Sequence, residues 1–194
     1  MTNVGAKTEG MVRYAAETRI SQFTIQAFAA GIIAVVAHSP KIAIREWSAE
    51  MQFAPDTLSD ASVSVRGSTA SFDCLDQLRD VDRRELQRVM MQEVLEVSKY
   101  PDFVFQSQTV NAEKQKQDLY RVSIMGDLTL HGVTRTHSFV CQVALGADSF
   151  RAYGEFTILQ SDYGIKVASV AGGTLKLQDE LKCTFYIVAR RSDS

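Results

Sequence analysis

The chain has 194 residues, 45% of them hydrophobic and 23% charged, and its formal net charge at pH 7 is −2. This composition is typical of a globular domain with a substantial core and excludes a disordered chain. The near-neutral balance gives no electrostatic attraction for nucleic acid or for an anionic membrane surface, so neither is expected as a partner.

A run of small and apolar residues, AFAAGIIAVVA, extends from Ala27 to Ala37. Because it is too short to span a bilayer as a helix, we do not expect an integral membrane protein. The residues before it include Glu9 and Glu17, whereas a signal peptide needs a short, net-positive start. A buried strand pair or a short helix is therefore favoured over a cleaved signal, and a cytoplasmic location is expected.

Apolar and polar residues alternate along most of the chain, which predicts strands with one buried face. The apolar positions are Phe23, Ile25 and Ala27; Val63 and Val65; Phe103 and Phe105; Val122, Ile124, Leu128 and Leu130; Phe139, Cys141, Val143 and Leu145; Phe150, Ala152, Gly154, Phe156 and Ile158; and Leu181, Cys183, Phe185 and Ile187. Short strands between turn residues predict an antiparallel all-β fold, either a sandwich or a barrel. Between Lys41 and Phe53 the apolar positions change phase, which predicts a bulge near Arg45 and Glu46.

One segment, at about residues 80–99, has helical spacing instead. Its apolar stripe consists of Leu86, Val89, Met90, Val94 and Val97. Asp82 and Glu85 resemble a capping box, and Pro101 is expected to end the helix. The stripe is predicted to pack on the sheet, with a ligand-lining or partner-binding role as the alternative, while Arg84 and Arg88 face water.

No repeat, low-complexity tract or Pro-rich linker divides the sequence. We therefore predict a single domain over residues 11–190, with loose ends at residues 1–10 and 191–194. The three cysteines, Cys74, Cys141 and Cys183, are far apart and have no metal-binding spacing. They indicate buried thiols in a reducing compartment.

Catalytic signatures are missing from the sequence, which has no GxSxG elbow, P-loop, HExxH or GxGxxG after a strand. A three-histidine metal site would need His38, His131 and His137 together, and their spacing fits no standard motif. Cys74 precedes the predicted helix, where a nucleophile gains from the positive helix end, but a small buried side chain is the more common role. We predict a protein that is not an enzyme and has no metal or cofactor.

The segment Gly126 to Phe139, GDLTLHGVTRTHSF, predicts a hairpin. If His131 and Gly132 form a two-residue type I′ turn, Arg135 and His137 begin on the apolar face, with Gly126 leaving room opposite His137. A turn longer by one residue would expose both side chains, and exposure is the commoner arrangement for charges near a turn.

Three stretches together resemble the YceI-like family: this hairpin, residues 99–107 (KYPDFVFQS), and the pair Gly154-Glu155-Phe156 and Ser161-Asp162-Tyr163-Gly164. They occur in the family's order and at about its spacing, and the resemblance extends from Tyr14 to Arg190. The chain departs from the family pattern before Pro101, where a charged helix, DRRELQRVMMQEVLEV, replaces a shorter run.

The resemblance implies an elongated, lipocalin-like antiparallel β-barrel of about eight strands, with an internal apolar channel and the helix packed beside it. Family members are described as binders of long isoprenoid chains, such as polyprenyl phosphates or isoprenoid quinones. We accordingly expect a non-catalytic carrier of a long-chain isoprenoid or similar lipid, which would co-purify with the protein. The alternatives are an enzyme acting on a lipid-like substrate in the same cavity and a filled β-sandwich that binds other proteins; a homodimer is left open.

The expected ligand-binding residues are the aromatic members of the strand faces and two polar residues of the hairpin. The aromatic residues are Phe23, Trp47, Phe53, Phe103, Phe105, Phe139, Phe156 and Phe185. Arg135 and His137 are expected at one mouth, where the guanidinium would donate two parallel bonds to a phosphate and His137 would add a donor. The competing interpretation pairs Arg135 with a carboxylate of a neighbouring strand and gives His131 only the role of tolerating the turn.

Overall fold

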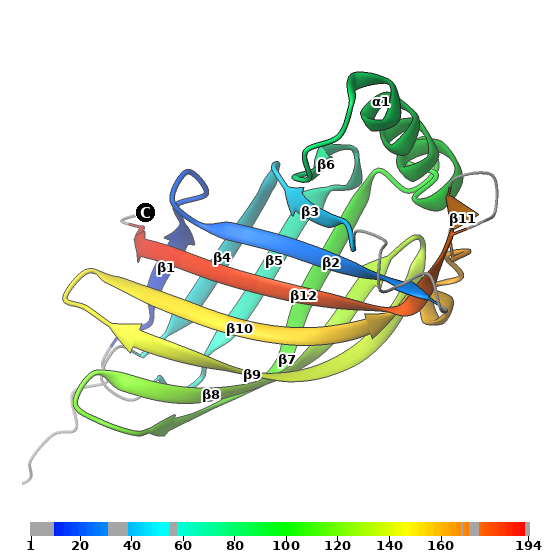
Figure 1. Cartoon of the computed structure of the whole chain (residues 1–194). Helices are drawn as coiled ribbons and strands as arrows, with labels where there is room; N and C mark the ends of the chain where they lie inside the picture. Colours follow the sequence, from blue (N-terminus) through cyan, green and yellow to red (C-terminus); the bar gives the residue numbers. More distant parts are fainter. Residues whose placement is uncertain (1–9, 31–38, 55–57, 168, 171–174, 193–194) are drawn as a thin grey trace, which may run out of the picture.

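The computed structural model describes residues 10–30, 39–54, 58–167, 169–170 and 175–192, and shows an elongated antiparallel barrel with a helix over one end (Figure 1). The strands are β1 (Val12–Ala16), β2 (Gln22–Ala30), β3 (Lys41–Ile44), β4 (Trp47–Phe53), β5 (Ser62–Ser68), β6 (Phe72–Cys74), β7 (Asp102–Lys114), β8 (Leu119–Leu130), β9 (Val133–Leu145), β10 (Ser149–Leu159), β11 (Ser169–Val170) and β12 (Leu175–Arg191). The helices are α1 (Asp80–Val89), a π-helical turn (Met90–Val94) and 3-10 turns at Thr69–Ser71 and Gln160–Tyr163.

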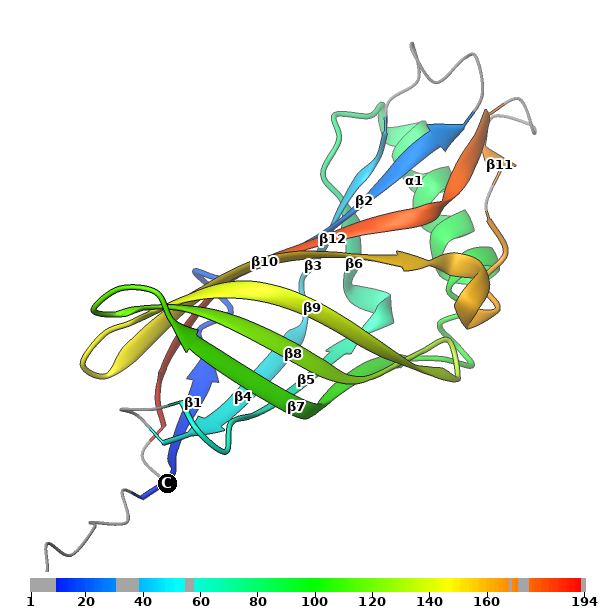
Figure 2. The ribbon, with the colours of Figure 1, turned by 90° about the horizontal axis from the view of Figure 1, so that it is seen from below.

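Eight strands close the barrel in the order β1-β4-β5-β7-β8-β9-β10-β12, and β1 pairs with β12 to complete the circle. The closing register places Tyr14 opposite Arg191 and Ala16 opposite Ala189. The long strand β12 then continues alongside β2, and β2, β3 and β6 extend the wall towards α1 (Figure 2). The lipocalin-like barrel expected from the sequence is confirmed.

The predicted phase change in the segment from Lys41 to Phe53 occurs at Arg45 and Glu46, which lie between β3 and β4. Here the regular strand pairing is interrupted, because the β3–β6 pairing ends at Ile44 and the β4–β5 pairing begins at Trp47. The Arg45 amide donates to the Ser71 carbonyl, and the Glu46 carbonyl accepts from the Ser68 amide. The positions that pack in the core are consequently even-numbered in β3, at Ile42 and Ile44, and odd-numbered in β4, from Trp47 to Phe53.

The hairpin between β8 and β9 has the register that a two-residue turn predicts. His131 and Gly132 have φ values of 51° and 75°, as a type I′ turn requires. Leu128 lies opposite Arg135, and Gly126 lies opposite His137.

The helix begins where the sequence predicts but ends earlier, since α1 covers Asp80–Val89 and the π-helical turn covers Met90–Val94. It begins at Asp80, and no side chain caps it, because Asp82 pairs with Arg79 and Glu85 pairs with Arg88; the predicted capping box is wrong.

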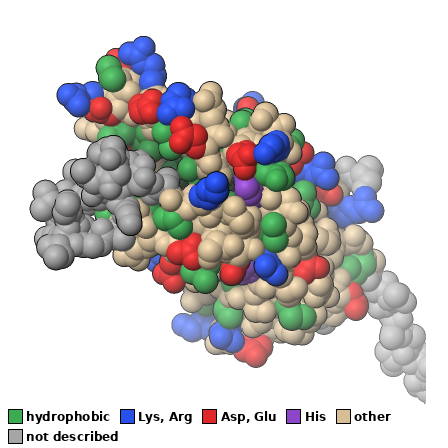
Figure 3. Space-filling view, turned by 90° about the vertical axis from the view of Figure 1, so that its right-hand side faces the viewer, with side chains coloured by type: hydrophobic (Ala, Val, Ile, Leu, Met, Phe, Trp, Pro, Cys, Tyr) green, Lys and Arg blue, Asp and Glu red, His purple; other side chains and the backbone are tan. Residues whose placement is uncertain are grey.

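The helical segment ends well before Pro101. After the π-helical turn, Glu96 takes a left-handed conformation with φ 44°, which stops the helix. Arg84 and Arg88 are exposed, as predicted. Figure 3 shows charged side chains of both signs gathered over the outer side of this end of the molecule.

Some predictions concern residues that the structure does not describe. The apolar run is described only as far as Ala30, within β2, and its remainder and His38 lie outside the described residues. The same holds for residues 1–9 and 193–194 of the two expected loose ends, whereas Arg191 is part of β12. No helix in the described ranges is long and apolar enough to cross a membrane.

Three inward-facing phenylalanine rings lie over glycines of neighbouring strands. The pairs are Phe103 over Gly67, Phe105 over Gly126, and Phe185 over Gly154. A Cβ atom at any of these glycines would come within 2.4–2.6 Å of the ring above it. The rings therefore occupy the space that a side chain at each glycine would fill, next to the backbone of the wall. Gly126 thus leaves room for Phe105, in addition to lying opposite His137.

We predict that Gly154→Ala destabilises the protein by about 1–3 kcal/mol, because the added methyl group overpacks the wall. The new Cβ would lie 2.4 Å from Cζ of Phe185 and 2.9 Å from Cβ of Cys141. Urea unfolding measures the loss. Gly10→Ala is the control, since no atom lies within 4 Å of a Cβ at that position. Equal stabilities of the two variants would contradict the prediction.

Candidate ligand-binding channel

An apolar cavity occupies the inside of the barrel. The volume within which the centre of a water molecule fits, without overlap with protein atoms, is about 240 Å³. A single buried water needs only ~10–15 Å³ by this measure, so the interior is a channel and not a packing defect. Side chains from β2 to β10, from β12 and from α1 line it.

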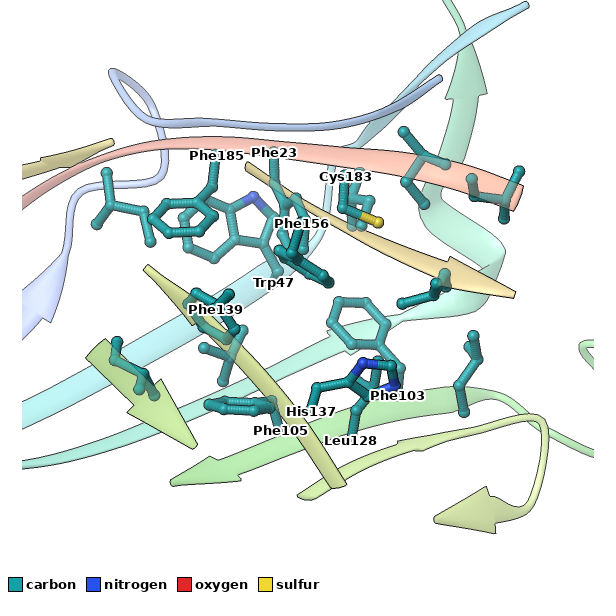
Figure 4. Close-up of a pocket in the computed structure, with 18 of the residues that line it drawn as sticks. Phe23, Trp47, Phe103, Phe105, Leu128, His137, Phe139, Phe156, Cys183 and Phe185 are labelled. Carbon is teal, nitrogen blue, oxygen red and sulfur yellow. The ribbon is translucent and has the colours of Figure 1, made fainter. Parts of the chain in front are cut away.

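All eight aromatic side chains predicted to line a channel do line it, and Figure 4 labels all of them except Phe53. Phe139 lies among them, with ring centres 5.0 Å from Phe156, 5.6 Å from Phe105 and 5.8 Å from Phe185. Such offset and edge-on contacts are favourable in themselves, so the rings keep their positions without a filled centre. That these residues bind a ligand stays a prediction.

An aromatic cluster closes the end of the barrel at which β1 pairs with β12. The ring of Tyr14 stacks on Phe53 at 4.7 Å, and Phe150 contacts both rings at 5.4 and 5.7 Å. Phe53 and Phe150 also line the channel, whereas Tyr14 lies behind them. The channel therefore extends from this cluster towards the end that carries α1.

The helix provides the lining at the opposite end. The channel is lined there by Leu86 and Val89 of α1, by Met90 and Val94 of the π-helical turn, and by Leu95, which follows that turn. Met90, Val94 and Val97 also pack with the core residues of the barrel, as predicted, so the stripe both packs on the barrel and borders the channel. The helical spacing of the apolar residues could not have distinguished packing from channel lining, because one apolar stripe is suited to both.

Arg135 does not line the channel. Its side chain is exposed, and Nε donates to the backbone carbonyl of Asp162 at 3.0 Å. Neither the predicted contact with a head group nor the alternative pairing with a strand carboxylate is supported by this geometry.

His137 is half-buried and lines the channel. Its Nε2 is hydrogen bonded to the hydroxyl of Tyr163 at 2.5 Å, and the two rings are nearly parallel, with an interplanar angle of 13°. Burial lowers the pKa of His137, and the nearby Asp162 carboxylate only partly opposes this effect. The imidazole is therefore uncharged at neutral pH.

His131, which the sequence suggested only as a turn residue, is buried and has three contacts. Its Nδ1 lies 3.2 Å from the carbonyl oxygen of Tyr163, its Nε2 lies 3.1 Å from Oε2 of Glu96, and its ring packs on Tyr100 at 4.1 Å. A hydrogen bond from Lys99 and the proximity of His131 lower the pKa of Glu96. His131 thus attaches the end of the helical segment to the hairpin.

The cysteines are free and buried. Cys141 and Cys183 line the channel, and burial raises the pKa of each thiol to about 12. Burial also raises the pKa of Cys74, which opposes the reactive-thiol alternative. Within the described part of the chain, no cluster of three His, Cys, Asp or Glu side chains could hold a metal ion.

Comparison with known proteins agrees with this architecture. The family model of the YceI-like domain matches residues 14–189. BcnA from Burkholderia cenocepacia is similar in structure, with a TM-score of 0.69 and 18% identity over 89% of this chain and 98% of that chain. A polyisoprenoid-binding domain from Saccharophagus degradans gives a TM-score of 0.68 with 12% identity, covering 93% of this chain and 99% of that chain.

A third similar structure is the Campylobacter jejuni YCEI protein, with a TM-score of 0.59 and 17% identity over 79% of this chain and 85% of that chain. No curated protein matches the sequence. At these identities the solved structures establish the shared fold, and the match to the family model establishes the family. The chain belongs to the YceI-like domain family.

We predict that His137 titrates below about 6.5, the usual value for histidine, in the folded protein. Because the folded state binds this proton less readily than the unfolded state, the effect on stability is fully favourable above about pH 6.5 and is lost as the pH falls below it. NMR titration of the ring protons measures the midpoint. A midpoint at or above 6.5 would show that the ring is more solvated than the structure indicates.

Proposed function

We propose that this protein binds a long-chain isoprenoid or a similar lipid in the channel and does not transform it. The observation that carries the proposal is the apolar channel itself, which aromatic and aliphatic side chains line from the Phe53–Phe150 end to α1. Transferring apolar surface from water into such a channel is favourable by about 25 cal/mol per Å². A long hydrocarbon chain matches this environment.

The description of the Saccharophagus degradans structure as a polyisoprenoid-binding domain supports an isoprenoid over other lipids. The eight aromatic side chains and His137 are the proposed ligand-contacting residues. Arg135 is not proposed among them, because its side chain is exposed to solvent and its Nε donates a hydrogen bond to the backbone carbonyl of Asp162. The buried free cysteines fit a cytoplasmic carrier better than an exported one.

The alternative function, an enzyme acting on a lipid in the same cavity, is less well supported by the polar groups of the channel. General acid–base catalysis needs a group whose pKa lies near the operating pH, and a nucleophilic thiol needs a lowered pKa. The partner of His137 is Tyr163, whose pKa burial raises, and the two channel thiols have pKa values of about 12. These side chains are suited to binding.

The direct test is mass spectrometry of the lipids that are extracted from the protein purified under native conditions. We expect a stoichiometric lipid with a long isoprenoid chain. Conversion of an added lipid to a product would support the enzyme instead. If nothing is bound and isoprenoid lipids do not change the fluorescence of Trp47, the only tryptophan and a channel-lining residue, the proposed function is wrong.

We predict that Phe139→Ala weakens lipid binding by about 1.5–3 kcal/mol, a roughly 10- to 100-fold increase in Kd, because a large apolar contact is removed from the channel. Titration of Trp47 fluorescence measures the affinity. Val140→Ala, at the next position of β9 with a side chain that is 40% exposed, is the matched control and should bind as the parent does. Equal losses for both variants would mean that the lipid does not lie in the channel.

A further inference from the structure

The polar groups that line the channel are few. In the described residues the lining contains no Lys, Arg, Asp or Glu, and its side chains with polar atoms other than thiols are Ser62, His137, Gln160 and Trp47, whose indole N–H only donates. Nε2 of Gln160 already donates to the carbonyl of Gln178 at 3.0 Å, and Ser62 is an exposed residue at the start of β5. The polar groups left for a lipid inside the channel are therefore His137 and the indole N–H of Trp47, and His137 has its orientation fixed by a hydrogen bond to Tyr163.

Tyr163 determines which nitrogen of His137 carries the proton. The tyrosine is completely buried, and its raised pKa keeps the hydroxyl protonated. A buried hydroxyl donates its proton to an acceptor, and in the described part of the chain the partner of this hydroxyl is Nε2 of His137. We assign the hydrogen bond as Tyr163 donating to Nε2, which leaves the imidazole proton on Nδ1.

The Nδ1–H group of His137 then has no acceptor within the described part of the chain. Figure 4 shows the ring among the side chains that line the channel. A donor in an apolar site is costly unless water or a ligand supplies an acceptor. A carbonyl oxygen at the end of a lipid would meet this need.

We propose that His137 donates a hydrogen bond from Nδ1 to an uncharged oxygen of the bound lipid, and that the channel consequently selects ketone or quinone head groups over phosphates. This inference rests on the proposed lipid-binding function and specifies its ligand class. A phosphate would enter without a compensating cation, because Arg135 lies outside and the described lining has no other positive group. An unpaired charge in an apolar site is far less favourable than an unpaired neutral group.

Three probes with the same isoprenoid chain test the inference: a ketone, a phosphate monoester and the hydrocarbon without a head group. Titration of Trp47 fluorescence at neutral pH measures each affinity. We expect the ketone to bind about two- to tenfold more tightly than the hydrocarbon, which is the effect of one hydrogen bond between neutral groups. The phosphate should bind most weakly.

The paired substitution His137→Phe with Tyr163→Phe removes both polar groups and keeps both rings. In this variant the advantage of the ketone over the hydrocarbon should disappear, while the hydrocarbon still binds. Arg135→Met is the control and should leave the order of the three probes unchanged. Nitrogen NMR of the parent protein, which needs no variant to fold, should show the His137 proton on Nδ1.

The outcomes separate the two proposals. If none of the three probes binds, the lipid-binding function is wrong. If the probes bind but the phosphate is the tightest or the three affinities are equal, lipid binding stands and the selectivity is overturned. A ketone advantage that persists in the double variant, or a proton on Nε2 in the parent, also overturns the role of His137.

Discussion

The large rings around the channel need space in the wall behind them, and the glycines of neighbouring strands supply it. Phe185 lies over Gly154 and Phe105 lies over Gly126, so each ring lies against the backbone and does not cross the lumen. In a barrel of eight strands, inward side chains otherwise fill the interior. The open channel therefore depends on the pairing of small and large residues across the strand ladder. This constraint distinguishes a binding barrel from a filled one built from equally apolar strands.

At the α1 end, Tyr163 connects the hairpin to the channel. His131 contacts its carbonyl oxygen and His137 contacts its hydroxyl, so the two histidines of one hairpin hold the same tyrosine. His131 also contacts Glu96, at the end of the helical segment that lines the channel. The position of the helix and the orientation of the polar group inside the channel therefore depend on one short β-turn, whose residues His131 and Gly132 both have positive φ.

The sequence predicted the features that depend on local periodicity. The barrel, the phase change at Arg45 and the hairpin register were all predictable, because a period of two and a two-residue turn determine which residues share a face. The same register placed Arg135 on the inner face opposite Leu128, yet its long side chain extends to solvent near the turn. The contact between His131 and Glu96 joins residues 35 positions apart, and no local pattern indicates it.

The limits of the helix prediction have a similar physical origin. An apolar stripe reports that a face is removed from water, and a channel wall and a packed sheet remove it equally well. What distinguishes the two cases is the volume that the opposing side chains leave empty, and here the glycine-backed rings leave that volume open. Once the volume exists, its ligand class depends on the few polar atoms that reach it. The long and charged Arg135 reaches water instead, and the shorter His137 remains inside, where Tyr163 is its hydrogen-bond partner and burial lowers its pKa. The proposed selectivity for a neutral head group thus rests on side-chain length and burial on a single strand.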